Sequence, residues 1–185
     1  MNVLTIDVGN TNTVFGAYNE SDELIFEMRV ETNPSRMADE YTLILMNMLR
    51  LHEIKKEEFE GVIISSVVPP VTEQLAAAVK RCMALEAMVV GPGVKTGLKI
   101  RIDDPATLGA YICCAGDAAK EYYPLPCIVI DLGTVSKVLA VNERGEFLGG
   151  ALAVGMKMAF ESLSSNTAAL PLISAGRVEK AIGSN

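Results

Sequence analysis

The chain opens with Met1-Asn2-Val3-Leu4-Thr5-Ile6-Asp7-Val8-Gly9-Asn10-Thr11-Asn12-Thr13, an apolar strand that runs directly into a polar loop. The pattern returns at Cys127-Ile128-Val129-Ile130-Asp131-Leu132-Gly133-Thr134. In both copies an Asp-x-Gly sequence and a threonine follow an apolar run. Two such loops, about one small domain apart, predict a duplicated α/β unit whose halves face each other across a nucleotide.

Each residue type in these loops has a use at a polyphosphate. The carboxylate of Asp7 or Asp131 can hold a cation or a water, and threonine hydroxyls can donate to phosphate oxygens. Glycine lets backbone N–H groups approach the phosphate closely. The alternative is an ordinary strand-to-hairpin turn, because Asp, Gly and Asn are common in turns. The repetition of the pattern favours phosphate binding over the turn.

The composition narrows the classes of protein that the chain can belong to. Its 185 residues are 50% hydrophobic and 21% charged, which is typical of a folded protein with a core. The net charge of -7 argues against a nucleic-acid partner, which would require a basic face. No apolar run approaches the ~20 residues of a membrane span, and no basic segment precedes the first apolar run. We therefore expect a soluble, cytoplasmic protein with no membrane partner.

The cysteines and the single histidine do not indicate a metal or acid–base site. Cys82, Cys113, Cys114 and Cys127 lack the spacing of metal ligands, and cytosolic thiols stay reduced. Most of them should therefore be small buried apolar residues. His52 follows an apolar helix, and we do not expect a catalytic role for it, although histidine is the usual acid–base residue.

The spacing of apolar residues predicts the element order of a ribonuclease-H-like domain. Strands are expected at residues 3–6, 13–18, 23–30, 61–68 and 88–90, and helices at 38–51, 71–83 and 106–123. The segment 61–68 is almost continuously apolar, which indicates a central strand that is buried on both faces. Met46 and Met48 of the first helix are expected in the core.

A second copy of this unit is expected to start before Asp131. It would continue through a hairpin at 137–141 and 146–148 and a helix at 156–164, after which 176–185 offers no further strands. We therefore expect an α/β, ribonuclease-H-like fold with a complete first domain at 1–124, which binds nucleotide, and an incomplete second domain at 125–185.

Further motifs follow the first loop in a fixed order. They are Ala38-Asp39-Glu40-Tyr41, Ile63-Ile64-Ser65-Ser66-Val67-Val68-Pro69-Pro70, Val89-Val90-Gly91-Pro92-Gly93-Val94-Lys95-Thr96-Gly97-Leu98, Asp104-Pro105, Gly109-Ala110, Asp131-Leu132-Gly133-Thr134 and Leu148-Gly149-Gly150-Ala151. In order and spacing, over nearly the whole chain, these segments resemble the type III pantothenate kinases, which belong to the actin-like ATPase and sugar-kinase superfamily.

The resemblance implies an activity and a set of site residues. Such kinases transfer the γ-phosphoryl group of ATP to pantothenate, the first step toward coenzyme A, with Mg²⁺ and a monovalent cation (K⁺ or NH₄⁺), and they work as dimers. The ATP-binding residues implied are Asp7, Val8, Gly9, Asn10, Thr11, Asn12, Thr13, Val14 and Thr134. The resemblance places the monovalent cation at Asp131 and the substrate at Gly109, Ala110, Tyr111 and Ile112.

The substrate motif departs from the family pattern. The family has Asp-Arg after Gly-Ala, where the Asp takes the proton of the pantothenate hydroxyl and the Arg helps to hold the substrate. Here Tyr111 and Ile112 stand at those positions. A phenol with an unperturbed pKa of about 10 is a poor base near neutral pH. Asp117 lies about 240° round the same predicted helix and roughly 9 Å along it, too far to replace the base. No catalytic residue of the family is therefore retained.

Other departures fall later in the chain. The second loop, usually Asp-x-Gly-Thr-Ala-Thr-Thr, continues here as Val135-Ser136-Lys137, and an Ala-Pro-Gly stretch has become Ala153-Val154-Gly155. Lys137 and Lys157 can supply charge to a phosphate, the alternative being ordinary solvated lysines. The family pattern also continues for roughly a quarter of its length beyond Asn185, through helices that build the dimer interface.

Three functions remain open on the sequence. The favoured one is a nucleotide-binding paralogue with impaired or absent phosphoryl transfer, which acts as a homodimer or beside a complete kinase subunit. The second is an active kinase that makes 4'-phosphopantothenate, using residues of a partner subunit. The third is a decayed, truncated gene product, against which stands the clean hydrophobic patterning up to residue 173. The apolar face of the predicted helix 156–164 predicts association through that region.

Overall fold

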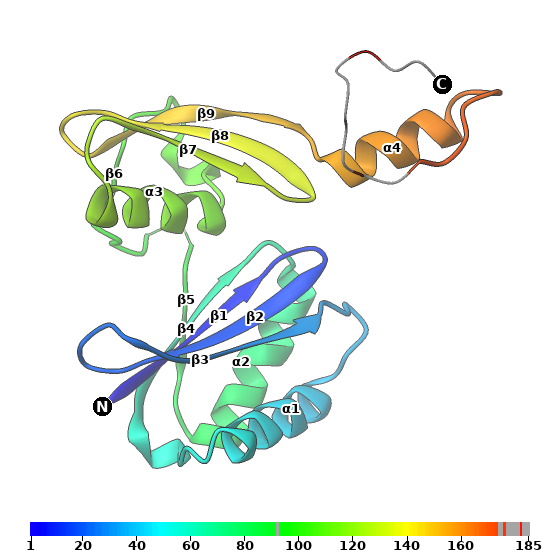
Figure 1. Ribbon diagram of the computed structural model, residues 1–185. Helices are drawn as coiled ribbons and strands as arrows, with labels where there is room; N and C mark the ends of the chain where they lie inside the picture. The colour runs from blue at the N-terminus through cyan, green and yellow to red at the C-terminus, as the bar shows by residue number, and fades with distance from the viewer. Residues whose placement is uncertain (92, 174–175, 177–181, 183–185) are drawn as a thin grey trace.

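The computed structural model describes residues 1–91, 93–173, 176 and 182 and contains two β-sheets, one above the other in Figure 1. The five-stranded sheet has the order β3-β2-β1-β4-β5, with bounds β1 Asn2–Val8, β2 Asn12–Tyr18, β3 Leu24–Glu31, β4 Phe59–Ser66 and β5 Ala87–Val89. The four-stranded sheet has the order β6-β9-β8-β7, with bounds β6 Lys99–Ile100, β7 Cys127–Leu132, β8 Val135–Val141 and β9 Glu146–Val154.

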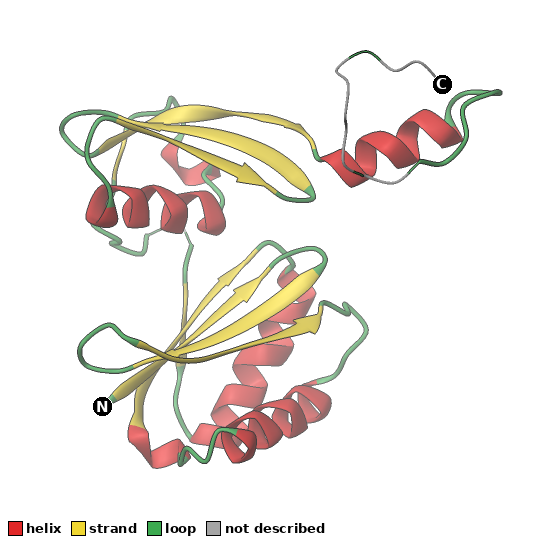
Figure 2. Cartoon of the chain, in the orientation of Figure 1, coloured by secondary structure: helices red, strands yellow, loops and turns green. Residues whose placement is uncertain are grey.

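The first sheet joins an antiparallel meander to two parallel strands. β1 pairs antiparallel with β2 and parallel with β4, which places Asp7 beside Val14 on one side and Ser65 on the other. The helices α1 (Ala38–Leu51) and α2 (Pro69–Met83) pack together on one face of this sheet, as Figure 2 shows. Their buried side chains form the larger core with the inward residues of β1, β2 and β4.

Local signals in the sequence fix the ends of these helices. The backbone N–H of Met37 donates to the Glu40 carboxylate at 2.9 Å at the start of α1. α2 begins with Pro69 and Pro70, which suit the first helical turn because its N–H groups have no intrahelical partner. It ends at Met83, and the capping residue Ala84 that follows has a φ of 58°, in the left-handed region.

The second sheet is a meander of β7, β8 and β9, to which β6 adds in parallel next to β9. Glu146 of β9 holds β6 in place, because its carboxylate accepts from Arg101 Nη2 at 2.8 Å and pairs with Lys99 Nζ at 2.9 Å. α3 (Ala110–Tyr122) packs on this sheet and forms a smaller core with it through Ala119, Leu139 and other buried residues. α4 (Met156–Ser165) follows β9.

α3 lies between the two sheets (Figure 1). It contributes Ala119 to the core of the second sheet, while Cys114 and Ala118 line a cavity with Thr5 and Ser65 of the first. Because the helix contacts both halves, the division of the chain into 1–124 and 125–185 stays a proposal.

The element order expected from the sequence is confirmed, with local differences. The predicted strand 61–68 runs from Phe59 to Ser66, because the helix starts at Pro69. The predicted helix 106–123 is a 3₁₀ turn at Pro105–Thr107 followed by α3, and another 3₁₀ turn occupies Lys56–Glu58. Strand β6 was not predicted, since two residues show no periodicity. The expected lack of strands at 176–185 concerns a segment mostly outside the described residues.

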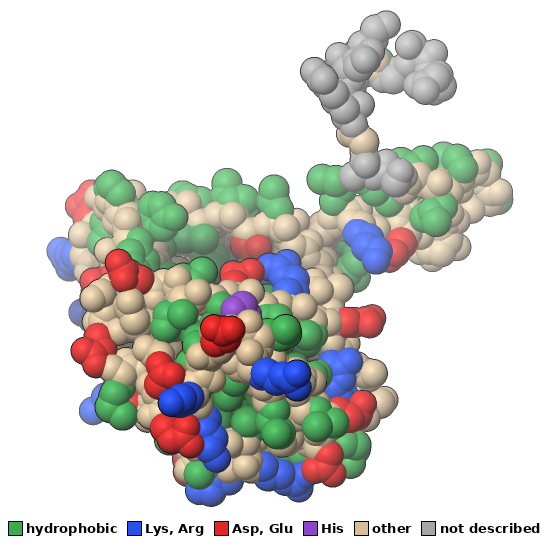
Figure 3. Space-filling model, turned by 60° about the horizontal axis from the view of Figure 1, so that its bottom comes forward, with side chains coloured by type: hydrophobic (Ala, Val, Ile, Leu, Met, Phe, Trp, Pro, Cys, Tyr) green, Lys and Arg blue, Asp and Glu red, His purple; other side chains and the backbone are tan. Residues whose placement is uncertain are grey.

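Several single-residue expectations can be compared with the structure. Met48 is fully buried, but the prediction for Met46 was wrong, because 54% of its surface is exposed. The His52 ring stacks on Phe26 with centroids 4.2 Å apart. Cys82 is buried, but Cys113, Cys114 and Cys127 are only partly buried, so the prediction that most of the cysteines are buried was wrong. Within the described ranges, no helix has both the length and the hydropathy to cross a membrane. Basic and acidic side chains are interspersed on the face shown in Figure 3.

Candidate functional site

The two Asp-x-Gly loops line one cavity of about 350 Å³. The hydroxyl oxygens of Thr11 and Thr134 are 3.1 Å apart across it, so the loops face each other as the repeated motif predicted. Among the residues expected to bind ATP or a cation, the lining includes Asp7, Gly9, Asn10, Thr11, Asn12, Val14, Asp131 and Thr134.

The first loop is a tight turn that presents its polar groups to the cavity. The Gly9 N–H donates to the Asn12 carbonyl at 2.9 Å, and a Cβ at Gly9 would lie only 3.1 Å from that oxygen. Asn10, Thr11 and Asn12 are exposed beyond the turn. The absence of a side chain at Gly9 therefore relieves crowding where the chain folds back on itself, and the polar side chains beyond the turn are exposed to a ligand.

Val8 and Thr13, also expected at the nucleotide, lie instead beneath the loop. Val8 is buried in the larger core. Thr13 is fully buried, and its hydroxyl oxygen lies 2.9 Å from that of Thr32. These two residues hold the ends of β1 and β2 in place under the loop.

The second loop packs against the start of α4. The Gly155 N–H donates to the Thr134 carbonyl at 3.1 Å. A Cβ at Gly155 would lie 2.2 Å from the Gly133 carbonyl oxygen and 2.4 Å from that of Thr134. Only glycine allows this close approach, so the conformation of the loop depends on a residue about twenty positions later.

Two carboxylates, one ammonium group and the guanidinium of Arg29 determine the charge of the cavity. Lys137 Nζ donates to Asp131 Oδ2 at 2.5 Å and lies 4.5 Å from the centroid of the Tyr111 ring. Burial raises the pKa of Asp7 above its usual range, with a smaller rise from Asp131, while Lys137 acts in the opposite direction. The Asp7 carboxylate is thus poised between one positive and one negative neighbour.

Tyr111, which the resemblance places at the position of the family's base, faces this cavity. Burial, followed by the carboxylates of Asp131 and Asp7, raises the pKa of its phenol to about 12. The hydroxyl therefore keeps its proton throughout the neutral range. Asp117 lies elsewhere on α3, with its carboxylate 3.9 Å from Lys120 Nζ.

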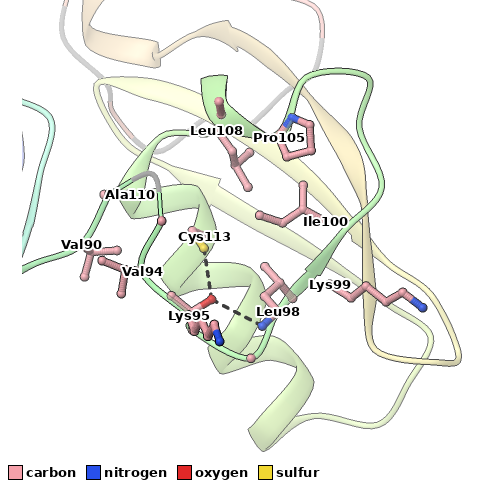
Figure 4. A pocket seen from close by; sticks show the side chains of 15 residues that line it. Val90, Val94, Lys95, Leu98, Lys99, Ile100, Pro105, Leu108, Ala110 and Cys113 are labelled. Atoms are coloured by element: carbon pink, nitrogen blue, oxygen red, sulfur yellow. Dashed lines mark hydrogen bonds between the residues drawn. The ribbon is translucent and has the colours of Figure 1, made fainter.

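The other residues of the predicted substrate motif have separate surroundings. Gly109 is the extended residue before α3, and Ile112 packs against the core of the second sheet. Ala110 lines a different cavity, of about 640 Å³, shown in Figure 4. There the Thr96 hydroxyl lies 3.4 Å from Cys113 Sγ. Of the four motif residues, Tyr111 is the one that lines the cavity between the two loops.

A third cavity, of about 460 Å³, lies on the other side of Tyr111, between α3 and the first sheet. Asp7 and Tyr111 line both this cavity and the one between the loops. Its other walls are mainly apolar and include Cys114 and Ala118. Ser65 Oγ is buried here and has no hydrogen-bond partner among the described residues.

Two basic residues of this site were not identified firmly from the sequence. Arg29 was missed, and Lys137 was left open as a solvated lysine. Arg29 of β3 lies opposite Val14 in the strand pairing and lines the cavity, but no motif surrounds it. Lys137 is only 20% exposed, against 85% for Lys157, which lies 3.9 Å from Glu161. The solvated alternative therefore describes Lys157 and not Lys137.

The residues present fit one of the two implied cations. Mg²⁺ in nucleotide sites is usually held by one or two carboxylates and the substrate phosphates, which Asp7 can provide. A monovalent cation at Asp131 does not fit, because the Lys137 ammonium group already occupies that carboxylate.

Comparison with known proteins gives relatives in sequence and in structure. A profile of the type III pantothenate kinases matches residues 3–185. A protein of *Moorella thermoacetica* described as a type III pantothenate kinase is 39% identical over 183 residues, which cover 99% of this chain and 72% of that protein.

Two solved structures share the fold at low identity. Component A of (R)-2-hydroxyglutaryl-CoA dehydratase from *Acidaminococcus fermentans* has a TM-score of 0.54 at 16% identity over 89% of this chain. The activator of 2-hydroxyisocaproyl-CoA dehydratase from *Clostridium difficile*, with bound ADPNP, has a TM-score of 0.53 at 11% identity over 90%. The chain spans 53% and 52% of these proteins, respectively. These likenesses support the ribonuclease-H-like, actin-like ATPase fold.

Proposed function

Because the chain belongs to the type III pantothenate kinase family, we propose that it binds MgATP between its two Asp-x-Gly loops and transfers phosphate to pantothenate poorly or not at all. The observation that carries this proposal is Tyr111, which faces the cavity from the position of the family base.

Nucleotide binding is supported by the chemistry of the cavity lining. The first loop exposes Asn10, Thr11 and Asn12, and the second loop brings Thr134 to within 3.1 Å of Thr11. Backbone N–H groups and threonine hydroxyls of such loops bind phosphate oxygens. In this proposal Asp7 holds the Mg²⁺, and the basic side chain of Lys137 offsets part of the phosphate charge.

Impaired transfer is supported by the pKa of Tyr111. A general base is most effective when its pKa lies near the working pH, and that of Tyr111 is raised to about 12. Ile112, at the position of the substrate arginine, packs against an apolar core and has no donor for a carboxylate. The chain thus keeps a phosphate cradle while both substrate-directed groups are missing.

Two measurements on the purified protein test this proposal separately. Titration calorimetry with MgATP measures binding, and mass spectrometry of mixtures with MgATP and pantothenate measures 4'-phosphopantothenate. We expect saturable ATP binding together with product formation far below ordinary kinase rates. Turnover at ordinary rates would contradict the impairment, whereas a lack of ATP binding would contradict the nucleotide site.

Location and assembly belong to the same proposal. A cytoplasmic location and association, as a homodimer or with a complete kinase subunit, remain predictions. Co-expression with a complete family member, followed by affinity purification through a tag on one chain, would test the heteromer.

A further inference from the structure

The ammonium group of Lys137 makes three contacts in the cavity. Lys137 of β8 lies directly opposite Asp131 of β7 in the strand pairing, so both side chains lie on one face of the sheet. Its Nζ donates to Asp131 Oδ2 at 2.5 Å and to the Val135 carbonyl at 3.3 Å. The third contact is the ring of Tyr111, whose centroid is 4.5 Å away.

These contacts resemble the surroundings of a small bound cation. A carboxylate and a backbone carbonyl are oxygen ligands that suit K⁺ or NH₄⁺, and a lysine ammonium differs from NH₄⁺ mainly in its covalent tether. Both partners are largely removed from solvent, with 20% of the Lys137 side chain and 24% of the Asp131 side chain exposed. Screening by water and salt is therefore weaker than for a surface pair.

A second cation at Asp131 would meet the ammonium group of Lys137. Asp131 Oδ2 already accepts from Lys137 Nζ, and two positive charges a few ångströms apart in a partly buried site repel strongly. The Asp131 carboxylate is thus matched by one positive charge, which the chain itself supplies.

We propose that Lys137 is a tethered cation that takes the place of the exchangeable K⁺ or NH₄⁺, so that ATP binding by this chain does not require a monovalent cation. The inference rests on the proposed nucleotide site, since the cavity must bind ATP for its salt dependence to be measured. The inference goes beyond the proposed function because it assigns the positive charge beside Asp131 to a side chain of the protein itself.

The first test compares ATP affinity in different salts. MgATP is titrated into the wild-type protein in KCl, NH₄Cl or N-methylglucamine chloride at equal ionic strength, because N-methylglucamine is too large for the site. The wild-type Kd should vary by less than about twofold among the salts. ATP binding that requires K⁺ would overturn the tethered cation, while failure to bind ATP in every salt would overturn the nucleotide site as well.

Substitution of Lys137 should make the ATP affinity depend on a monovalent cation. Lys137→Thr places the residue of the family pattern opposite Asp131. Its ATP affinity should fall about tenfold in N-methylglucamine chloride and recover in KCl. Lys157→Thr is the matched control, because it removes the same charge from an exposed position on α4 and should leave the Kd unchanged. Equal Kd values for Lys137→Thr in all salts would contradict the proposal.

Thermal unfolding without nucleotide provides an independent measurement. A cation that binds only the native state raises the unfolding temperature. At equal ionic strength, the unfolding temperature of Lys137→Thr should be higher in KCl than in N-methylglucamine chloride. The unfolding temperature of the wild-type protein should be the same in the two salts. A KCl-specific stabilisation of the wild type would show that an exchangeable cation site survives, which would overturn the inference.

Discussion

Thr11 and Thr134 are separated by 123 residues along the chain, yet their hydroxyl oxygens lie 3.1 Å apart. One follows β1 of the first sheet and the other follows β7 of the second. The pair marks the point where the two sheets approach each other at the cavity. A phosphate group that bridges the loops would engage both hydroxyls.

Removal of the Thr134 hydroxyl should weaken ATP binding without unfolding the protein. Thr134→Val keeps the shape of the side chain, and the lost hydrogen bond should raise the Kd about fivefold to tenfold in titration calorimetry. The residue is exposed, so the unfolding temperature should change little. Thr167→Val is the control, since among the described residues that hydroxyl donates to the Leu163 carbonyl in the last turn of α4. An unchanged Kd for Thr134→Val would remove Thr134 from the nucleotide site.

A carboxylate at position 111 should restore phosphoryl transfer. Tyr111→Asp places the base of the family pattern in the cavity, and pantothenate phosphorylation should rise roughly 100-fold, a typical contribution of general-base catalysis. The rate is measured by mass spectrometry of 4'-phosphopantothenate under saturating MgATP.

Tyr111→Phe is the matched control for this gain. It removes the hydroxyl without adding a base, so its rate should stay at the wild-type level. Ile112→Arg is not suitable as a companion change, because it would place a charge against the apolar core on which Ile112 packs. No gain in Tyr111→Asp with intact ATP binding would show that the lost base does not limit the rate.

Glu146 should make stability depend on pH in the acid range. Hydrogen bonds from Arg101, Lys99 and Asn142 lower its pKa from 4.5 to about 2. Since the folded pKa is depressed, this stabilisation is complete above about pH 4.5 and is lost as the pH falls toward 2. Urea unfolding of the wild-type protein at a series of pH values should show this decline.

Glu146→Gln should lower stability at neutral pH and flatten the curve between pH 4.5 and 2. Glu161→Gln is the control, because Glu161 is an exposed glutamate 3.9 Å from Lys157. If Glu146→Gln and Glu161→Gln gave the same pH curve, Glu146 would not be the residue that ties β6 to β9.

Gly155 should tolerate no side chain. Gly155→Ala would force a methyl group against the backbone carbonyls of Gly133 and Thr134, which cannot move aside as a flexible side chain could. We expect a loss of about 1–3 kcal/mol in the free energy of unfolding and weaker ATP binding. Gly61→Ala in β4 is the control, since a Cβ there meets no atom within 4 Å. Equal stability of the two variants would contradict the contact.

The apolar face of α4 predicts self-association. Met156, Met158 and Leu163 are exposed on this helix, and Ile130 and Leu152 are exposed on the second sheet. Sedimentation velocity at micromolar concentration should therefore show a species larger than the monomer, and Leu163→Glu should shift it toward the monomer. A monodisperse wild-type monomer would refute association through this region.

The first sheet could be predicted closely from the sequence because its signals are local. The helix Ala38–Leu51 follows from apolar periodicity, and β4 follows from its continuous apolar run. β6 could not be predicted, because it consists of two residues held by the carboxylate of Glu146, far along the chain. Met46 was misplaced because periodicity alone did not fix the buried stripe of the helix to within one residue.

The candidate site shows the same limit. The repeated motif led to both loops, since each loop carries its own signal after a strand. Arg29 and the partnership of Lys137 with Asp131 depend on strand pairing, and such contacts leave no mark within a short window of sequence. The sequence also did not show that Val8 and Thr13 are buried while their neighbours in the loop are exposed.

The contact of Gly155 with the second loop lets a residue outside the cavity control the shape of its lining. Gly155 closes the triplet Ala153-Val154-Gly155 and is not among the residues that line the cavity. The glycine remains at the one position of that triplet where a Cβ would lie 2.2 Å from a carbonyl oxygen. A side chain at position 155 would therefore change the cavity indirectly, by deforming the loop that lines it and without removing any lining group.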